Sequence, residues 1–288
     1  MGPSGDAKLD SLPAPGGEAD CRAGPIQELL LFAGAVRPSP LLKAVRRNVL
    51  DLPLLDGQTI GTRWQAAADS ISRSVRIRVL TDAKSPVPAS TSEDRTSIEP
   101  DDVAFLGTGG LLRAAARGRN GKLLVATGGS VLTSPLAGVV DHLLSLDADV
   151  ALYAEHDGTP TGLMLVSADV LQEMPGAGYM DFKEQCLPGI AERHRVRVAH
   201  ASAVQSVCMP VRDREHYLAA LARLSGGAPF AIVESRAEVA ATSRMRDAVV
   251  LAGARVDDKA VIARSVLGPG AAVAKSQVVT DAILGSGS

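Results

Sequence analysis

The sequence predicts an α/β domain with a mostly parallel sheet, followed by a short parallel β-helix. Two observations support this fold class. From Gln27 to Leu224, apolar segments typical of buried strands alternate with segments of helical spacing, the pattern of a sheet covered by helices on both faces. Beyond them, aliphatic residues recur about every six positions, a period that fits stacked hexapeptide coils rather than a helix or a flat strand.

The first half of the α/β domain contains a strand, a helix and a second strand. Residues 27–33 (QELLLFA) form an apolar run that ends at Gly34, which indicates a buried strand entering a loop. Residues 59–72 have the apolar spacing of a helix, and residues 75–81 alternate as a strand does. The polar, Pro- and Ser-containing stretch 82–99 is expected to be a surface loop.

The second half continues the alternation. Segments of helical spacing precede and follow short apolar runs, so each run is expected to be a strand of the same sheet. Ligands of such folds sit at the carboxyl ends of the strands. The predicted helices are 111–117, 135–146, 168–173 and 213–224, and the predicted strands are 122–126, 148–154 and 162–166.

The C-terminal repeat is carried by single aliphatic residues separated by Gly, Ala, Asp, Lys and Ser. Its phase slips by one residue between Ile262 and Leu267. We expect about two coils, which must attach to the preceding domain because each coil buries its core only against its neighbours. An ordinary pair of Ala- and Val-rich strands is the alternative. The repeating residues are Val250, Val256, Ile262, Leu267, Val273 and Val279.

These patterns divide the chain into three parts. Residues 1–24 are rich in Gly, Pro, Asp and Ala and are expected to be a disordered tail. Residues 25–228 form the α/β domain, and residues 229–288 form the β-helix. The N-terminus has no apolar signal-peptide core, and no segment is long and apolar enough to span a bilayer. A cytoplasmic location is therefore expected.

Charge and cysteine content exclude several classes of partner and site. The formal net charge is -2, so neither a nucleic acid nor a membrane is expected as a partner, since such binding relies on concentrated Lys and Arg. Three widely spaced cysteines, Cys21, Cys186 and Cys208, predict neither a disulfide framework nor a cysteine metal site.

Three segments carry residues suited to anionic ligands. After the first strand come Gly34, Arg37, Pro40-Leu41 and Arg47. A glycine turn lets backbone N–H groups approach phosphates, and arginines neutralise the phosphate charge. An ordinary turn with solvent-facing arginines is the alternative.

The other two segments combine glycines or charged residues with a helix start. Gly107-Thr108-Gly109-Gly110 precedes a helical run, and a helix N-terminus offers free N–H donors. Lys183 and Glu184, in Asp181-Phe182-Lys183-Glu184, are a charged pair that could equally be the solvent-facing start of a helix.

An α/β domain followed by hexapeptide repeats and bearing these motifs resembles the sugar-1-phosphate nucleotidyltransferases, or nucleotide-sugar pyrophosphorylases. The resemblance implies a nucleotide-binding, Rossmann-like mixed sheet of the GT-A type and a left-handed β-helix. It also implies that Mg²⁺ assists the attack of a sugar 1-phosphate on a nucleoside triphosphate. By this resemblance, the catalytic positions are Arg37, Arg47 and Lys183, the nucleotide-binding ones are Gly34, Gly107, Thr108 and Gly109, and the sugar-binding ones are Gly162 and Glu184.

The same comparison exposes departures from the family. The family's two metal-binding aspartates fall at Gly129 or Ser130 and at Pro210 in this chain. No carboxylate stands at these positions, and Mg²⁺ prefers carboxylate and phosphate oxygens. The family's Glu-Lys-Pro segment is also absent. Asp213, three residues beyond Pro210, is expected to cap a helix instead.

The sequence therefore supports a divergent nucleotidyltransferase-like protein. The first hypothesis is a catalytically impaired protein that binds a nucleotide, nucleotide-sugar or sugar phosphate, or acts in regulation, with no resident metal. The alternative is an active enzyme that uses Mg²⁺ held by substitute ligands, beginning with Asp51 and Asp181. A short solenoid leaves an open strand edge and an apolar end, so that end or the flank of the solenoid is expected to pack on the α/β domain or on a second subunit. A homo-oligomer formed through the C-terminal region is the expected assembly.

Overall fold

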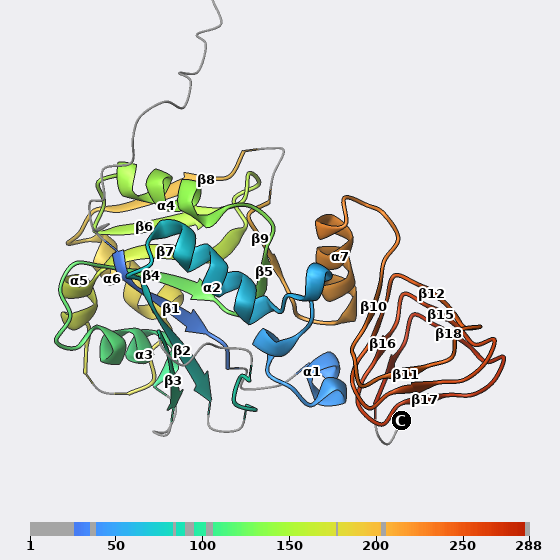
Figure 1. Cartoon of the computed structure of the whole chain (residues 1–288). Coiled ribbons are helices and arrows are strands. Elements are labelled where there is room, and N and C mark those ends of the chain that lie inside the picture. The colour runs from blue at the N-terminus through green and yellow to red at the C-terminus, as the bar shows by residue number, and fades with distance from the viewer. Residues whose placement is uncertain are drawn as a thin grey trace, which may run out of the picture.

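A computed structural model of the chain describes residues 26–34, 39–82, 85–89, 95–101, 106–176, 178–202 and 206–285. It consists of an α/β domain and a triangular β-helix lying side by side (Figure 1). The tail predicted at residues 1–24 lies outside the described residues. Within the described ranges, no helix is both long and apolar enough to cross a membrane.

The α/β domain is built on a mixed seven-stranded sheet with the order β3-β2-β1-β4-β7-β6-β8. The neighbouring strands are parallel except that β7 runs antiparallel to both β4 and β6. This arrangement confirms the predicted fold class. The strands are β1 (Ile26–Phe32), β2 (Arg76–Asp82), β3 (Thr96–Asp101), β4 (Lys122–Thr127), β6 (Val150–Ala154), β7 (Pro160–Ser167) and β8 (Val196–His200).

Helices cover both faces of this sheet, and a small antiparallel pair of strands, β5 (Ser130–Leu132) with β9 (Cys208–Pro210), lies beside it. The longest helix, α2, begins with a capping box in which Thr59 and Thr62 bond each other's backbone. The helices are α1 (Pro40–Val45), α2 (Ile60–Ile71), α3 (Gly107–Ala116), α4 (Leu136–Ser145), α5 (Ala168–Gln172), α6 (Leu187–Ala191) and α7 (Arg214–Leu224), with short turns η1 (Val49–Asp51), η2 (Leu55–Gly57) and η3 (Phe182–Cys186).

The central strand β1 supplies side chains to both faces. Leu29 and Leu31 pack in one apolar cluster with α2 and α4, whereas Leu30 packs in a second cluster with α3, α5 and α6. Successive side chains of a strand point to opposite faces. A strand buried on both faces therefore reads as a continuous apolar run, which is why the sequence identified this one.

The β-helix has three faces, and each face is a small parallel sheet. Cα partners on neighbouring coils are 17 residues apart, as in Val239↔Val256 and Val256↔Val273. The strands are β10 (Ala231–Val233), β13 (Ala248–Val250), β16 (Val266–Leu267) and β19 (Ile283–Leu284) on the first face, β11 (Glu238–Val239), β14 (Arg255–Val256) and β17 (Ala272–Val273) on the second, and β12 (Arg244–Arg246), β15 (Val261–Ala263) and β18 (Val278–Thr280) on the third.

The interior of the β-helix contains the predicted column of aliphatic residues. All six of the repeating residues, from Val250 to Val279, are buried. The change of spacing after Ile262 recurs in every coil, because the third side of each coil is one residue shorter than the other two. That side turns at Asp247, Arg264 and Asp281, which lie 17 residues apart and all have positive φ.

The predicted number of coils was too low. The order of the strands gives three complete coils and a first strand of a fourth. The missed coil begins at β10 and carries Val233, Val239 and Met245 at the repeat positions. These three are only partly buried or exposed because no coil precedes them.

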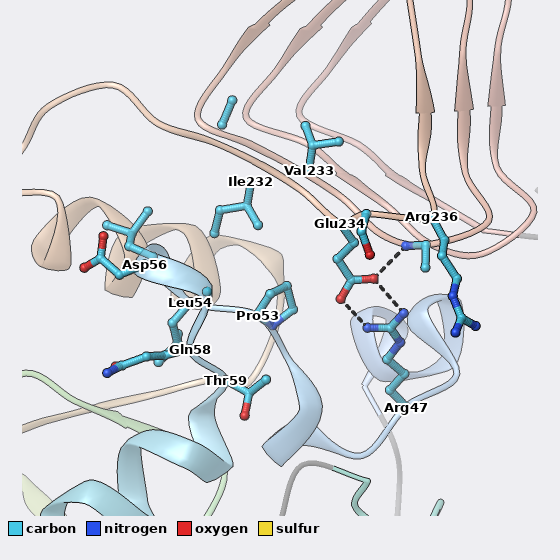
Figure 2. A pocket seen from close by; sticks show the side chains of 15 residues that line it. Arg47, Pro53, Leu54, Asp56, Gln58, Thr59, Ile232, Val233, Glu234 and Arg236 are labelled. Atoms are coloured by element: carbon cyan, nitrogen blue, oxygen red, sulfur yellow. Dashed lines mark hydrogen bonds and ion pairs between the residues drawn. The ribbon is translucent and has the colours of Figure 1, made fainter.

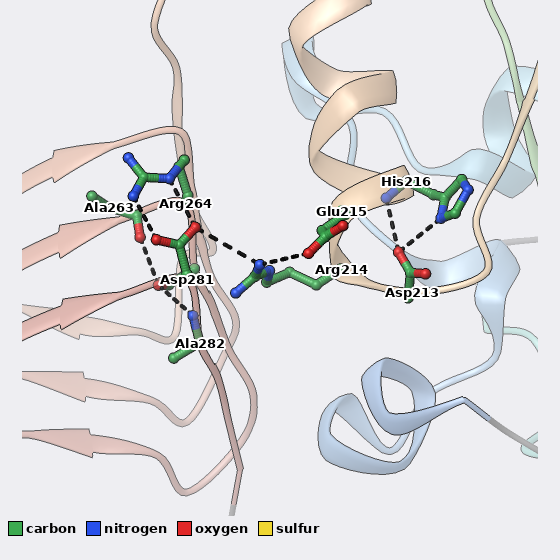
Figure 3. Close-up of polar contacts among 9 residues, drawn as sticks. Asp213, Arg214, Glu215, His216, Ala263, Arg264, Asp281 and Ala282 are labelled. Atoms are coloured by element: carbon green, nitrogen blue, oxygen red, sulfur yellow. Dashed lines mark hydrogen bonds and ion pairs between the residues drawn. The ribbon is translucent and has the colours of Figure 1, made fainter.

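The β-helix joins the α/β domain through apolar and charged contacts. Val249, Leu251 and Val266 belong to the same buried cluster as Tyr217 and Leu221 of α7, so one core runs through both parts. At the edge of this contact, Arg214 of α7 lies 3.8 Å from Asp281, which also pairs with Arg264 (Figure 3).

Two sequence-based boundaries were wrong. The stretch 82–99 was expected to be a loop, but its last residues belong to β3, which pairs with β2 at the edge of the sheet. An edge strand has one solvated side, so its polar sequence TSIEPD resembles that of a loop. Helix α3 begins at Gly107 rather than Leu111, with the glycines inside its first turn.

Candidate functional site

The ends of three neighbouring strands of the sheet are tied together by backbone hydrogen bonds. Beyond β1, the Ala33 N–H donates to the Leu80 carbonyl over 2.9 Å. Beyond β4, the Gly128 N–H donates to the Phe32 carbonyl over 2.8 Å. A Cβ at Gly128 would lie 3.2 Å from that same oxygen. The ends of β2, β1 and β4 are thus held side by side, at the edge where α/β folds bind ligands.

The glycine–arginine segment after β1 is described only in part. Gly34 is exposed directly beyond the strand, and Arg37 lies outside the described residues. The chain resumes at Ser39, whose hydroxyl accepts a hydrogen bond from the Leu42 N–H and so caps α1. Whether Gly34 and Arg37 contact phosphate stays a prediction.

The second glycine segment packs tightly against a distant part of the chain. Gly107 has a φ of +70°, and a Cβ there would lie 2.3 Å from the Met180 carbonyl oxygen. The Gly109 N–H donates to the same oxygen over 2.9 Å. The Thr108 hydroxyl accepts from the Phe182 N–H over 2.9 Å. Glycine is therefore required at 107 by the backbone conformation and by this contact.

This packing brings two of the predicted groups together. Lys183 and Glu184 are exposed, and their N–H groups donate to the Asp181 carboxylate over 2.9 and 3.0 Å. Asp181 is also 3.3 Å from the Thr108 hydroxyl. Lys183 and Glu184 thus start η3 next to the glycine turn, which is also the arrangement expected of a solvent-facing helix start.

Gly162 approaches the end of β4. Its φ is +82°, and a Cβ there would lie 2.5 Å from the hydroxyl oxygen of Thr127. The space beside this glycine is taken up by a side chain of the same sheet. Its predicted contact with a sugar is untested.

The two positions that were predicted to match the family's metal-binding aspartates lie together in space. Ser130 of β5 and Pro210 of β9 are Cα partners in the antiparallel pair. The adjacent Val211 N–H donates to the Gly129 carbonyl over 2.8 Å. The two aligned positions are thus neighbours in space, and their correspondence to the family's metal ligands stays a prediction.

The residues at this place do not fit a magnesium ion. Ser130 is buried, and Pro210 offers no side-chain donor atom. Across the part of the chain that is described, no three His, Cys, Asp or Glu side chains converge as metal ligands. Asp213 instead caps α7 by accepting from the His216 N–H over 2.9 Å (Figure 3), a hydrogen bond that lowers the pKa of Asp213.

The two candidate substitute ligands are held by other partners. Both oxygens of the Asp51 carboxylate accept from the Ala89 N–H, over 2.9 and 3.1 Å. Asp181 caps η3 as described above. Neither arrangement favours a role for these carboxylates at the β5–β9 pair.

Arg47 forms an ion pair with the β-helix. Its Nη1 and Nη2 donate to Oε1 and Oε2 of Glu234 over 2.5 and 2.8 Å (Figure 2). This pair lies at the wall of a 690 Å³ cavity between the two parts of the molecule, lined also by Pro53 and Ile232. A phosphate that used the Nη1–Nη2 edge of Arg47, the residue predicted to contact it, would have to displace Glu234. No residue pattern had singled out Glu234.

The pKa values of the pair reflect this contact. The hydrogen bond with Glu234 raises the pKa of Arg47. Burial opposes ionisation of Glu234, but hydrogen bonds from Arg47 and from the Ala252 N–H outweigh it and lower the pKa of the carboxylate. Both groups are therefore charged at neutral pH.

Two cysteines are buried free thiols. Cys186 and Cys208 have no disulfide partner among the described residues. Burial raises the pKa of both thiols above the ordinary value, and the shift at Cys208 is large. Such thiols are poor nucleophiles, because the thiolate is the reactive form.

Comparison with known proteins identifies the fold. No protein-family model and no curated protein sequence matches the chain. Among solved structures, it is similar to HddC from Yersinia pseudotuberculosis, with a TM-score of 0.53 and 15% identity over 68% of this chain and 98% of HddC. It is also similar to a protein from Bacillus anthracis assigned as a glucose-1-phosphate thymidylyltransferase, with a TM-score of 0.52 and 13% identity over 69% and 95% of the two chains. The chain shares the fold of these proteins.

Proposed function

We propose that this chain is a nucleotidyltransferase-like protein that binds a nucleotide or nucleotide-sugar without metal-dependent transfer. The pairing of Ser130 with Pro210 carries the proposal. Two family positions that must converge on a metal do converge here, yet neither supplies a carboxylate. The fold shared with a protein assigned as a thymidylyltransferase supports the same general class.

The loss of both carboxylates bears on the chemistry of transfer. A triphosphate and a sugar phosphate repel each other unless cations neutralise them. Electrostatic contacts of this kind each contribute roughly a hundredfold or more in rate. The tight turn between β6 and β7, closed by the Glu155 N–H on the Thr159 carbonyl at 2.8 Å, adds to the proposal. It joins the two strands directly, without the family's Glu-Lys-Pro segment.

The direct test is an assay of pyrophosphate release with calorimetry beside it. Nucleoside triphosphates would be tried with sugar 1-phosphates and Mg²⁺ or Mn²⁺. We expect release at background and measurable heats of nucleotide binding. Robust turnover would refute the loss of catalysis, and an absence of binding to every nucleotide and nucleotide-sugar would refute the binding function.

A restored-ligand variant sharpens this test. A Cβ at Gly129 would meet no atom closer than 3.9 Å, and Pro210 is exposed. The double variant Gly129→Asp/Pro210→Asp should therefore gain Mn²⁺ binding, measurable by electron paramagnetic resonance. The control is Gly138→Asp/Gly189→Asp, which adds the same charge at two sites with no atom within 4 Å of a Cβ. Equal Mn²⁺ binding by the two variants would contradict the assigned metal positions.

Self-association through the C-terminal region is part of the same proposal. Strands β17 and β18 are the last strands of their sheets, and Val278 on β18 is 64% exposed. Open strand edges and exposed apolar side chains favour pairing with another chain. Sedimentation velocity should show a dimer or larger species that Val278→Lys weakens. A monomer at all concentrations would contradict the idea.

A further inference from the structure

Arg47 occupies a turn that links the β-helix with the loop after β1. Arg46 has a φ of 52° and ends α1, so the chain turns sharply before Arg47. The next residue, Asn48, is buried, and its side-chain amide donates to the carbonyls of Ala33 and Pro86. Arg47 is thus adjacent to a residue that contacts the end of the first strand.

Glu234 holds the guanidinium of Arg47 in a two-pronged contact. Oε2 of Glu234 also accepts from the Ala252 N–H over 2.6 Å, which anchors the carboxylate to the second coil. The side chains of Arg47 and Glu234 are 24% and 22% exposed. The Glu234 carboxylate is therefore held by a second hydrogen bond, and both side chains of the pair are partly shielded from water. A fully exposed ion pair has neither of these features.

Helix α1 lies directly on the β-helix beside this pair. A Cβ at Gly268 would be 2.5 Å from the Ala44 carbonyl oxygen, and one at Gly285 would be 2.9 Å from it. These glycines are 17 residues apart and occupy equivalent positions on successive coils. The backbone of α1 can approach this closely only because both positions lack a side chain.

We propose that Glu234 is an internal counter-anion that competes with ligand phosphate for Arg47, an autoinhibitory contact made by the β-helix. A guanidinium binds carboxylates and phosphates through the same parallel N–H pair. Glu234 therefore occupies one of the two parallel N–H pairs through which this guanidinium could bind a phosphate, and its charge repels a second anion. The inference rests on the proposed nucleotide binding, and it assigns the β-helix a role in weakening that binding.

The test compares charge-neutral variants of the full chain with inorganic tripolyphosphate as the probe in calorimetry. Glu234→Gln is nearly isosteric and frees Arg47. We expect it to bind tripolyphosphate about tenfold more tightly than the unmodified chain, because Arg47 then forms one more charge-assisted hydrogen bond with a phosphate oxygen. The matched control is Asp69→Asn, which changes net charge equally and breaks an exposed ion pair with Arg95. It should bind within about twofold of the unmodified chain, because screened surface pairs contribute little.

The double variant Arg47→Ala/Glu234→Gln should lose the gain. Equal affinities for Glu234→Gln and Asp69→Asn would overturn the inference, as would a gain that survives removal of Arg47. These outcomes are separate from those of the proposed function. A chain that binds nucleotides while Glu234→Gln shows no gain keeps the proposed function and loses the counter-anion. If Glu234→Gln binds tripolyphosphate more tightly but the chain binds no nucleotide, the counter-anion inference stands and the proposed function is refuted.

Discussion

The β-helix and the carboxyl edge of the α/β sheet differ in how their residues acquire a role. In the β-helix, a position is defined by its place in a 17-residue coil, so Val256 and Val273 share one buried environment. At the sheet edge, each residue is defined by a different distant partner, as Gly107 is by Met180. The role of a residue in the β-helix follows from the local repeat, whereas the role of a residue at the sheet edge follows from its contact with a distant part of the chain. Equivalent substitutions in successive coils should therefore change the free energy of unfolding by similar amounts. At the sheet edge, each substitution should have an effect set by its own partner.

The largest expected effect is a cavity in the β-helix interior. Ile262 is fully buried, and Ile262→Ala should lower the free energy of unfolding by about 3 kcal/mol. Val198→Ala, on strand β8 and 47% exposed, should change it by less than about 0.5 kcal/mol. Urea denaturation followed by circular dichroism measures both. Similar losses for the two variants would mean that the interior assignment is mistaken.

The next effect tests an individual contact at the sheet edge. Gly107→Ala adds a Cβ that would overlap the Met180 carbonyl and strains a positive φ, so a loss of about 2–3 kcal/mol is expected. Gly118→Ala is the control, since its φ is also positive, at +67°, but no atom lies within 4 Å of a Cβ. It should cost only the backbone strain, about 1 kcal/mol. Equal thermal shifts would show that the Met180 contact contributes nothing.

A smaller effect concerns the helix between the two regions. The Asp213 carboxylate accepts from the His216 N–H at the start of α7. Asp213→Ala should reduce the free energy of unfolding by about 1 kcal/mol. Asp213→Asn, which keeps an accepting oxygen, should recover most of the loss. If Asn and Ala behave alike in chemical denaturation, the cap is not the source of the effect.

The smallest effect is a pH dependence from the contact between the regions. The folded-state pKa of Glu234 is lowered, so its stabilising contribution is fully present above the unfolded value, near 4.5. That contribution is lost as the pH falls from about 4.5 through the lower folded pKa. Stability measured between pH 6 and pH 3 should fall more steeply for the unmodified chain than for Glu234→Gln. Parallel profiles would contradict the lowered pKa.

The sequence predicted the fold well for physical reasons that these regions illustrate. Burial requires apolar residues along the whole of β1 and at every interior position of the β-helix. The first requirement appears in the sequence as a continuous apolar run, and the second appears as a repeat of aliphatic residues. The edge strand β3 was missed because one side of an edge strand is solvated, so its residues are polar and show neither pattern. The first coil carries the same periodic pattern in Val233, Val239 and Met245, so this coil was predictable from the sequence although it was not predicted.

The candidate site was only partly predictable. Motif alignment placed the family's two metal positions at Gly129 or Ser130 and at Pro210 without saying how they lie in space, and the structure pairs Ser130 with Pro210. The partner of Arg47 was not foreseeable, because Glu234 lies 187 residues further along the chain and in the other part of the molecule. The 17-residue spacing of Gly268 and Gly285 was the one available signal of a docked helix.

The seating of α1 on Gly268 and Gly285 restricts how this chain can lengthen in evolution or by engineering. A duplicated coil appended beyond Gly285 would leave the seat unchanged. A copy of residues 247–263 inserted ahead of Gly268 would instead present the duplicate of Leu251 to the Ala44 carbonyl, since Leu251 precedes Gly268 by one coil. A leucine side chain has no room where even a Cβ would be 2.5 Å from that oxygen. Growth of the solenoid is therefore directional, open at its far end and blocked near the domain it adjoins.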